Sequence, residues 1–168
     1  MSVTLVVVRH GQAQSMAEAP SDYARRLTAE GRAALAEAFP RTFALLDVPE
    51  GGVELWASVA LRAQDTADEV ARVIPVAERR ESDTLFFQDV GSIVDEVAER
   101  LAENRDGVVV AVGQIPSVED LSVLFGGAQL DFSPGSVAAF ELDPDLHMLE
   151  MGRPAGKLLW FVRGPKVL

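Results

Sequence analysis

Two continuous runs of aliphatic residues dominate the pattern of hydrophobic and polar positions. The first covers residues 3–8, where five positions are aliphatic, and the second covers residues 108–112, Val-Val-Val-Ala-Val. Such runs, without polar alternation, are typical of strands buried on both faces in sheets that helices cover. Shorter runs predict strands over residues 53–57, 136–142 and 156–162, with a brief strand or connector at 74–76.

Helical spacing of apolar residues separates these strands. It predicts helices from 28 to about 46 and from 92 to 104, and a further helix after 116 that ends at the glycine pair 126–127. Thr28 is the expected N-cap of the first helix, and 14–21 and 78–89 are expected loops. Strands joined through helices favour crossover connections. The sequence therefore predicts one α/β domain over residues 1–168, a three-layer α/β/α sandwich around a central, mostly parallel sheet.

Composition and charge narrow the possible functions. The 168 residues are 48% hydrophobic and 24% charged, with no cysteine and a formal net charge of −11. The absence of cysteine excludes disulfides and cysteine nucleophiles, and the acidic balance argues against nucleic acid as a partner. Neither a run of ~18 apolar residues nor a secretory signal is recognisable, so we expect no membrane partner and a cytoplasmic location. A phosphate could still bind where a few arginines converge.

The best candidate chemistry lies at the end of the first apolar run, in the tripeptide Arg9-His10-Gly11. Ligand crevices of open α/β sheets lie at the carboxyl ends of strands. A neutral imidazole is a nucleophile near neutral pH, a guanidinium matches phosphate oxygens, and Gly11 permits a close approach that a Cβ would block. On this tripeptide alone, a strand-end cation beside a solvated histidine is an equally acceptable interpretation.

Arg-His-Gly after an N-terminal strand resembles the signature of the histidine phosphatase superfamily, which is also called phosphoglycerate mutase-like. Residues 21–31, S-D-Y-A-R-R-L-T-A-E-G, are similar to the segment S-D-x-x-R-P-L-T-x-x-G of its short, SixA-like branch, with Arg26 in place of proline. In that family the segment lies beside the phosphate pocket. The resemblance therefore implies that Asp22 and Arg25 contribute to substrate binding, although both could equally be solvated flanking residues.

Two further segments carry the resemblance. Residues 58–67, S-V-A-L-R-A-Q-D-T-A, resemble the family block S-P-x-x-R-A-x-Q-T-A, which makes Arg62 the second phosphate-binding arginine and Ser58 the residue at the strand-to-helix turn. The second apolar run continues into Gly113-Gln114, where the family has V-G-H-x-P. Gln114 thus replaces the second histidine; it keeps a hydrogen-bond donor but loses charge and proton exchange.

The resemblance implies a phosphohistidine phosphatase acting on a phosphorylated protein or a small phosphorylated substrate, without a cofactor or metal. In this hypothesis His10 attacks phosphorus, Arg9 and Arg62 hold the oxygens, Gln114 donates a further hydrogen bond, and Gly11 and Gly113 line the pocket. The alternative is a catalytically inactive module of the same fold that binds phosphate or phosphohistidine.

A mutase or phosphomonoesterase is a weaker third hypothesis, because no proton donor can be singled out among Glu81, Asp83 and Asp89. His147, the only other histidine, is expected to be a surface strand residue. The oligomeric state is left open.

Overall fold

The computed structural model describes residues 3–104, 106–142 and 154–167. Its single sheet has six strands in the order β3-β2-β4-β1-β5-β6. These strands are β1 (Val3–Arg9), β2 (Val53–Ser58), β3 (Val76–Ser82), β4 (Val108–Gly113), β5 (Val137–Leu142) and β6 (Gly156–Val162). The pairs β3–β2, β2–β4 and β4–β1 are parallel, whereas β5 pairs antiparallel with both β1 and β6. The prediction of a central, mostly parallel sheet is confirmed.

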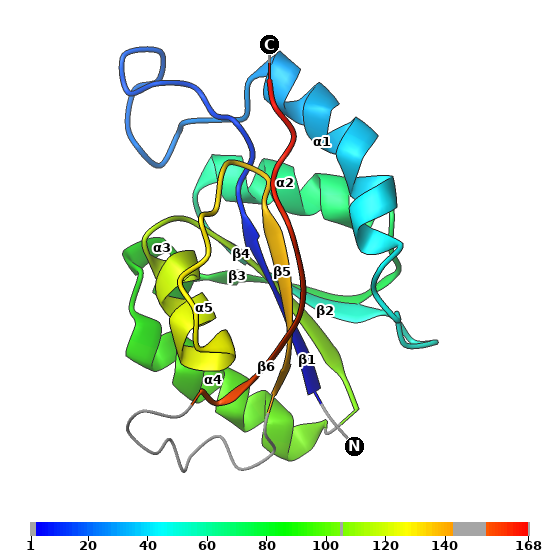
Figure 1. The fold of residues 1–168 in the computed structure, drawn as a ribbon. Helices are drawn as coiled ribbons and strands as arrows, with labels where there is room; N and C mark the ends of the chain where they lie inside the picture. The colour runs from blue at the N-terminus through cyan, green and yellow to red at the C-terminus, as the bar shows by residue number, and fades with distance from the viewer. Residues whose placement is uncertain (1–2, 105, 143–153, 168) are drawn as a thin grey trace.

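Helices cover both faces of this sheet, as Figure 1 shows. The helices are α1 (Ala29–Phe43), α2 (Leu61–Ala71), α3 (Asp83–Phe87), α4 (Val90–Glu103) and α5 (Ser117–Gly126). One core cluster joins apolar side chains of α3, α4 and α5 to alternate residues of β1, including Leu5 and Val7. The other joins α1 and α2 to the intervening residues Val6 and Val8. The expected three-layer α/β/α sandwich is therefore present, with β1 buried on both faces.

The ends of several elements differ from the sequence prediction. Thr28 caps α1 as expected, because its hydroxyl oxygen accepts a hydrogen bond from the Gly31 amide at 2.9 Å, but the helix ends at Phe43 rather than near 46. The expected loop 78–89 is wrong for most of its length: residues 78–82 belong to β3 and residues 83–87 form α3. β3 lies at the sheet edge, where strands tolerate charged side chains on their solvent side. The turn expected near 143–145 and His147 fall outside the described residues.

Candidate active site

The carboxyl ends of β1 and β4 bring the first group of predicted site residues together. Arg9 and Gly113 are register partners in the two parallel strands, and the backbone amide of His10 donates to the Gly113 carbonyl at 3.0 Å. A Cβ on Gly11 would lie 2.8 Å from a methyl carbon of Leu35 in α1, so the backbone here approaches the helix more closely than a side chain would allow. The strand end is thereby held rigidly within the fold.

The His10 ring has one defined tautomer. Its Nδ1 lies 2.7 Å from the carbonyl oxygen of Gly11, and a carbonyl can only accept, so Nδ1 carries the proton. Nε2 lies 3.3 Å from Nε of Arg62, and a guanidinium can only donate, so Nε2 presents its lone pair. The ring is therefore oriented as a nucleophile whose unprotonated nitrogen faces a cation.

Electrostatics keeps this imidazole neutral. Burial, followed by the charges of Arg62, Arg9 and Arg25, lowers the pKa of His10 to about 4, against the hydrogen bond to Gly11, which acts to raise it. The side chain is almost fully enclosed, and three cations disfavour a fourth positive charge nearby. At neutral pH the nucleophilic form therefore predominates.

Arg62 connects the His10 site to α2. It lies in the first turn of that helix and is buried. Its backbone carbonyl accepts from the Thr66 hydroxyl at 2.8 Å, and the same hydroxyl oxygen accepts from the Gly11 amide at 3.1 Å. Thr66 thus joins the strand end that carries His10 to the helix turn that carries Arg62. The position four residues after Arg62 is the sequence signal for this role, because residues i and i+4 share a helix face.

Asp22 and Arg25 join the site from the loop before α1. Nη1 of Arg62 donates to the Asp22 backbone carbonyl at 2.8 Å, and Nη2 contacts its carboxylate at 3.2 Å. Arg25 donates to the same carboxylate at 3.0 Å. Partial burial acts to raise the pKa of Asp22, but the hydrogen bonds and charges of the two arginines outweigh it and hold that pKa below its ordinary value. The site therefore contains an ionised carboxylate between two cations.

Arg9 is the last residue of β1 and directly precedes His10. Its Nη1 donates to the Phe132 carbonyl at 2.6 Å, and its Nε is buried with no hydrogen-bond partner among the described residues. Burial lowers the pKa of Arg9, against the charges of Glu119 and Asp131, which raise it. A buried donor without an acceptor is costly, and an anionic ligand would relieve that cost.

Gln114 is brought beside Arg62, but its amide is oriented differently from the sequence expectation. Its Oε1 accepts from Nη2 of Arg62, and its Nε2 donates to the Phe86 carbonyl at 3.1 Å. Reversing the amide would set donor against donor and acceptor against acceptor, so this orientation is the consistent one. Gln114 therefore positions the guanidinium of Arg62, and one of its amide N–H groups is engaged by the Phe86 carbonyl.

The remaining candidates are placed less centrally. Ser58 is buried at the end of β2, where its hydroxyl accepts from the Ala60 amide at 3.3 Å at the start of α2. Asp89 caps α4 by accepting from the Ser92 amide at 3.2 Å, and Glu81 and Asp83 are exposed. The roles of the Phe86 and Phe132 carbonyls could not be predicted from the sequence, since a backbone acceptor carries no residue signature.

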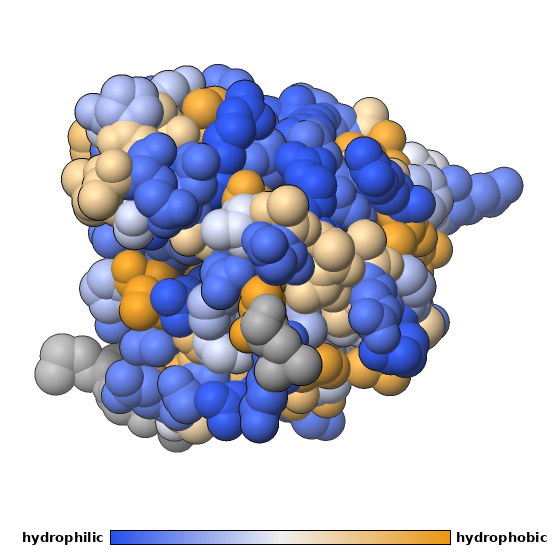
Figure 2. Space-filling view, turned by 90° about the horizontal axis from the view of Figure 1, so that it is seen from above, coloured by the Kyte–Doolittle hydropathy of each residue, from blue (hydrophilic) through white to orange (hydrophobic). Residues whose placement is uncertain are grey.

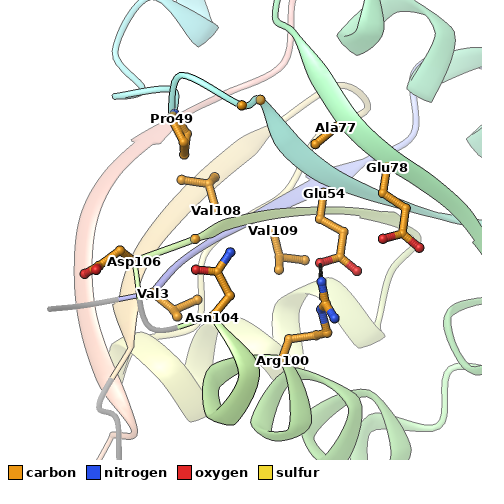
Figure 3. Close-up of a pocket in the computed structure, with 13 residues that line it drawn as sticks. Val3, Pro49, Glu54, Ala77, Glu78, Arg100, Asn104, Asp106, Val108 and Val109 are labelled. Carbon is orange, nitrogen blue, oxygen red and sulfur yellow. Dashed lines mark hydrogen bonds and ion pairs between the residues drawn. The ribbon is translucent and has the colours of Figure 1, made fainter.

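A cavity of about 400 Å³ lies at the opposite end of the sheet. Figure 3 shows Val3, Val108 and Val109 lining it, with Arg100 of α4 reaching Glu54 of β2. Nε of Arg100 donates to Glu54 at 2.7 Å. This cavity lies where the parallel strands begin, at the end of the sheet opposite His10.

No metal-holding group of three or more histidine, cysteine, aspartate or glutamate side chains occurs within residues 3–104, 106–142 and 154–167. Across the same described ranges, every helix is too short or too polar to span a bilayer.

Of the comparisons with known proteins, the one with solved structures identifies the fold. No family model matches the sequence, and no curated protein sequence matches it. Among solved structures, the protein histidine phosphatase SixA in complex with tungstate superposes with a TM-score of 0.79 at 21% identity, covering 95% of this chain and 96% of that chain. A protein from Nakamurella multipartitia assigned as phosphohistidine phosphatase SixA gives 0.73 at 24% identity, with 98% and 97% covered.

A more distant neighbour extends the comparison. The phosphoglycerate mutase of Plasmodium falciparum gives a TM-score of 0.65 at 14% identity, covering 100% of this chain and 95% of that chain. The mixed six-stranded sheet of this chain, with helices on both faces, matches the α/β fold of these structures. The chain therefore has the α/β fold of the phosphoglycerate mutase-like histidine phosphatases.

Proposed function

We propose that this protein is a phosphohistidine phosphatase in which Nε2 of His10 accepts the phosphoryl group. The observation that carries the proposal is the state of the His10 ring: Nδ1–H is held by the Gly11 carbonyl, Nε2 is unprotonated and faces Arg62, and the pKa is lowered to about 4. Phosphoryl transfer depends mainly on positioning and charge stabilisation. Arg62, whose Nε faces Nε2, supplies positive charge at the reacting nitrogen, and Arg9 adds a second nearby cation.

The reaction has two steps. A bond forms between Nε2 and phosphorus while the bond from phosphorus to the substrate's imidazole nitrogen breaks. Water then attacks phosphorus, the bond to Nε2 breaks with its electron pair returning to the ring, and phosphate leaves as dihydrogen phosphate, which keeps both protons of the water. Because the Gly11 carbonyl keeps Nδ1 protonated, His10 departs in the second step as a neutral imidazole without a separate acid.

The same reasoning favours a phosphorus–nitrogen bond in the substrate. A phosphohistidine protonated on its other ring nitrogen also releases a neutral imidazole, whereas an alkoxide leaving group needs a proton from the enzyme. The carboxylate that forms an ion pair with Arg62 is that of Asp22, whose pKa lies below its ordinary value. It is therefore ionised and has no proton to donate to a leaving group. This argues against a mutase or a general phosphomonoesterase.

A second candidate, a phosphate- or phosphohistidine-binding module without turnover, is favoured by Gln114. Its Oε1 contacts Arg62 and one of its N–H groups is held by Phe86, so it contributes less to a developing phosphoryl charge than a cationic group would. Removing one preorganised donor typically slows catalysis by about 10²- to 10³-fold. Such a loss leaves measurable turnover of an energetic substrate.

Phosphate release from free phosphohistidine separates the two candidates. We expect turnover by the unaltered protein and none by His10→Ala. Activity that appears only in Gln114→His would assign the natural chain to the binding module. Undiminished hydrolysis by His10→Ala would remove His10 from the mechanism altogether.

A further inference from the structure

One buried carboxylate of α2, that of Asp65, takes no part in the proposed reaction. Its side chain is 5% exposed and lies three residues after Arg62, on the same face of the helix. Its Oδ2 accepts from the Leu27 amide at 3.2 Å, and its Oδ1 contacts Nη1 of Arg26 at 2.8 Å and Nη2 of Arg32 at 2.9 Å. A buried carboxylate is stable only where charged or hydrogen-bonding partners compensate it. Here those partners come from the loop before α1 and from α1 itself.

Asp65 bonds the end of a polar segment, residues 22–27, which we call the anchored segment. Among residues 12–28 only Leu27 is buried, so apolar packing does little to fix this part of the chain. Figure 2 views the molecule from the end of the sheet at which β1 terminates, and hydrophilic residues cover much of the surface there. The conformation of the anchored segment therefore depends on hydrogen bonds, and the bond from the Leu27 amide to Asp65 fixes its last residue.

The first turn of α2 holds the start of the anchored segment. The Leu61 amide donates to the Tyr23 carbonyl at 3.1 Å. Nη1 of Arg62 donates to the Asp22 carbonyl at 2.8 Å. The anchored segment is therefore bonded to α2 at both ends, and Asp65 is the partner at the end away from Arg62. A displacement of that end shifts the backbone carbonyl that holds the Arg62 guanidinium.

We infer that Asp65 is a positioning residue for the phosphoryl site and acts through the anchored segment on Arg25 and Arg62. The inference rests on the proposed function and adds a residue to it. Nε of Arg25 donates to the Gln14 carbonyl at 2.6 Å and its Nη1 donates to Asp22 at 3.0 Å, so the direction of this guanidinium depends on where the segment lies. Charge that is already in place costs no rearrangement during phosphoryl transfer, and its displacement slows the reaction.

A second carboxylate of α2, that of Glu69, provides the structural comparison. It lies one turn further along the helix, and its side chain is 1% exposed. It pairs with Arg32 at 3.1 Å, as Asp65 does, and with Arg72 at 3.8 Å. Neither of these contacts involves the anchored segment. Asp65 and Glu69 are therefore alike in helix, burial and shared arginine, and they differ in the contact that the inference concerns.

Matched neutral substitutions of the two carboxylates test the inference. Asp65→Asn and Glu69→Gln each remove one buried negative charge and keep the length of the side chain. Both should unfold at a lower urea concentration, because each leaves Arg32 with fewer charge partners. Only Asp65→Asn should lower kcat/KM for phosphohistidine, by about tenfold and mainly through kcat, because displaced cations stabilise the transferring charge less well. Glu69→Gln should keep kcat/KM within about twofold.

Two exposed arginines provide a second matched pair that leaves the buried carboxylates in place. Arg26 is 57% exposed and contacts Asp65, whereas Arg72 is 67% exposed and contacts Glu69. Arg26→Glu sets a carboxylate against Asp65 and should displace the anchored segment, which lowers kcat/KM by about fivefold. Arg72→Glu makes the same change of charge against Glu69 and should keep kcat/KM within about twofold.

Equal activity of Asp65→Asn and Glu69→Gln would reduce Asp65 to a structural role and overturn the inference. If Asp65→Asn does not fold, the arginine pair decides, and equal activity of Arg26→Glu and Arg72→Glu overturns it. Absence of phosphohistidine hydrolysis by the unaltered protein contradicts the proposed function instead. The affinity of the variants for inorganic phosphate, measured by isothermal titration, then decides separately: weaker binding only in Asp65→Asn and Arg26→Glu supports the inference, and equal affinities overturn it.

Discussion

The two ends of the parallel strands differ in how they hold their arginines. At the amino end, Arg100 contacts the carboxylates of both Glu54 and Glu103, and Glu54 also accepts from the Trp56 indole at 2.9 Å. At the carboxyl end, Arg62 is matched by one half-exposed carboxylate, that of Asp22.

Arg9 widens this difference. Its Nη1 donates to an uncharged carbonyl, and its Nε has no hydrogen-bond partner within the described part of the chain. A cation satisfied by two carboxylates stabilises the fold, whereas a cation with an unused donor near a neutral imidazole attracts an anion. Spare positive charge, rather than the presence of a cavity, therefore distinguishes the candidate site.

The largest expected effect comes from removing the nucleophile. His10→Ala should lower phosphohistidine hydrolysis on the order of 10⁴-fold or more, because the covalent route is lost. Glu54→Gln, at the other end of the sheet, should leave kcat/KM within about twofold. Steady-state phosphate release measures both variants, and a comparable loss in both would show that the two ends are not functionally distinct.

Matched substitutions of the two arginines sharpen the comparison. Arg62→Ala should lower kcat/KM by about 10²- to 10³-fold and, because it removes buried hydrogen bonds to Asp22 and Gln114, should also lower the free energy of unfolding. Arg100→Ala should preserve kcat/KM but cost about 1–3 kcal/mol of stability, since it strips the charge partner from Glu54. Urea unfolding alongside phosphate release provides both readouts. Loss of activity in Arg100→Ala with no loss of stability would contradict the assignment.

Acid should affect the carboxyl end through His10. Its pKa is lowered to about 4 by burial and nearby cations, from about 6.5 in an unfolded chain. The unfolded state therefore binds a proton between these values and the folded state does not. Stability is full above pH 6.5 and falls by up to about 1.4 kcal/mol per pH unit as pH drops towards 4.

The variant His10→Gln provides the control for this pH effect, because it should lack that share of the pH dependence. The activity of the unaltered protein should persist down to about pH 5, since Nε2 remains unprotonated above the pKa of His10. Thermal unfolding and kcat/KM are measured across pH 4 to 8. Identical stability profiles for the two proteins would show that the pKa of His10 is not lowered.

The smallest expected effect concerns Asp22. Its carboxylate occupies donors of Arg62 and Arg25 that an anionic ligand could use. Asp22→Asn should therefore tighten binding of inorganic phosphate by roughly two- to fivefold, the range of a partly exposed ion pair. Isothermal titration measures the affinity. Weaker binding would instead mean that the carboxylate is needed to orient the arginines.

The sequence predicted the fold better than the details of the site. The apolar runs that became β1 and β4 carry their own burial signal, and Thr28 signalled the start of α1. β3 was predicted only as a brief strand or connector at 74–76, because an edge strand keeps charged residues on its exposed side. The amide orientation of Gln114 could not be predicted, since it depends on the Phe86 carbonyl, which the fold brings in from α3.

Trapping of the enzyme intermediate tests the central claim most directly. The protein is mixed with phosphohistidine labelled in its phosphoryl group, quenched in alkali, in which phosphohistidine is stable, and mapped by mass spectrometry. The account predicts a phosphoryl group on His10 that forms and decays at rates sufficient for phosphate release. Release of phosphate with no label on His10, or with the label on another residue, would contradict it.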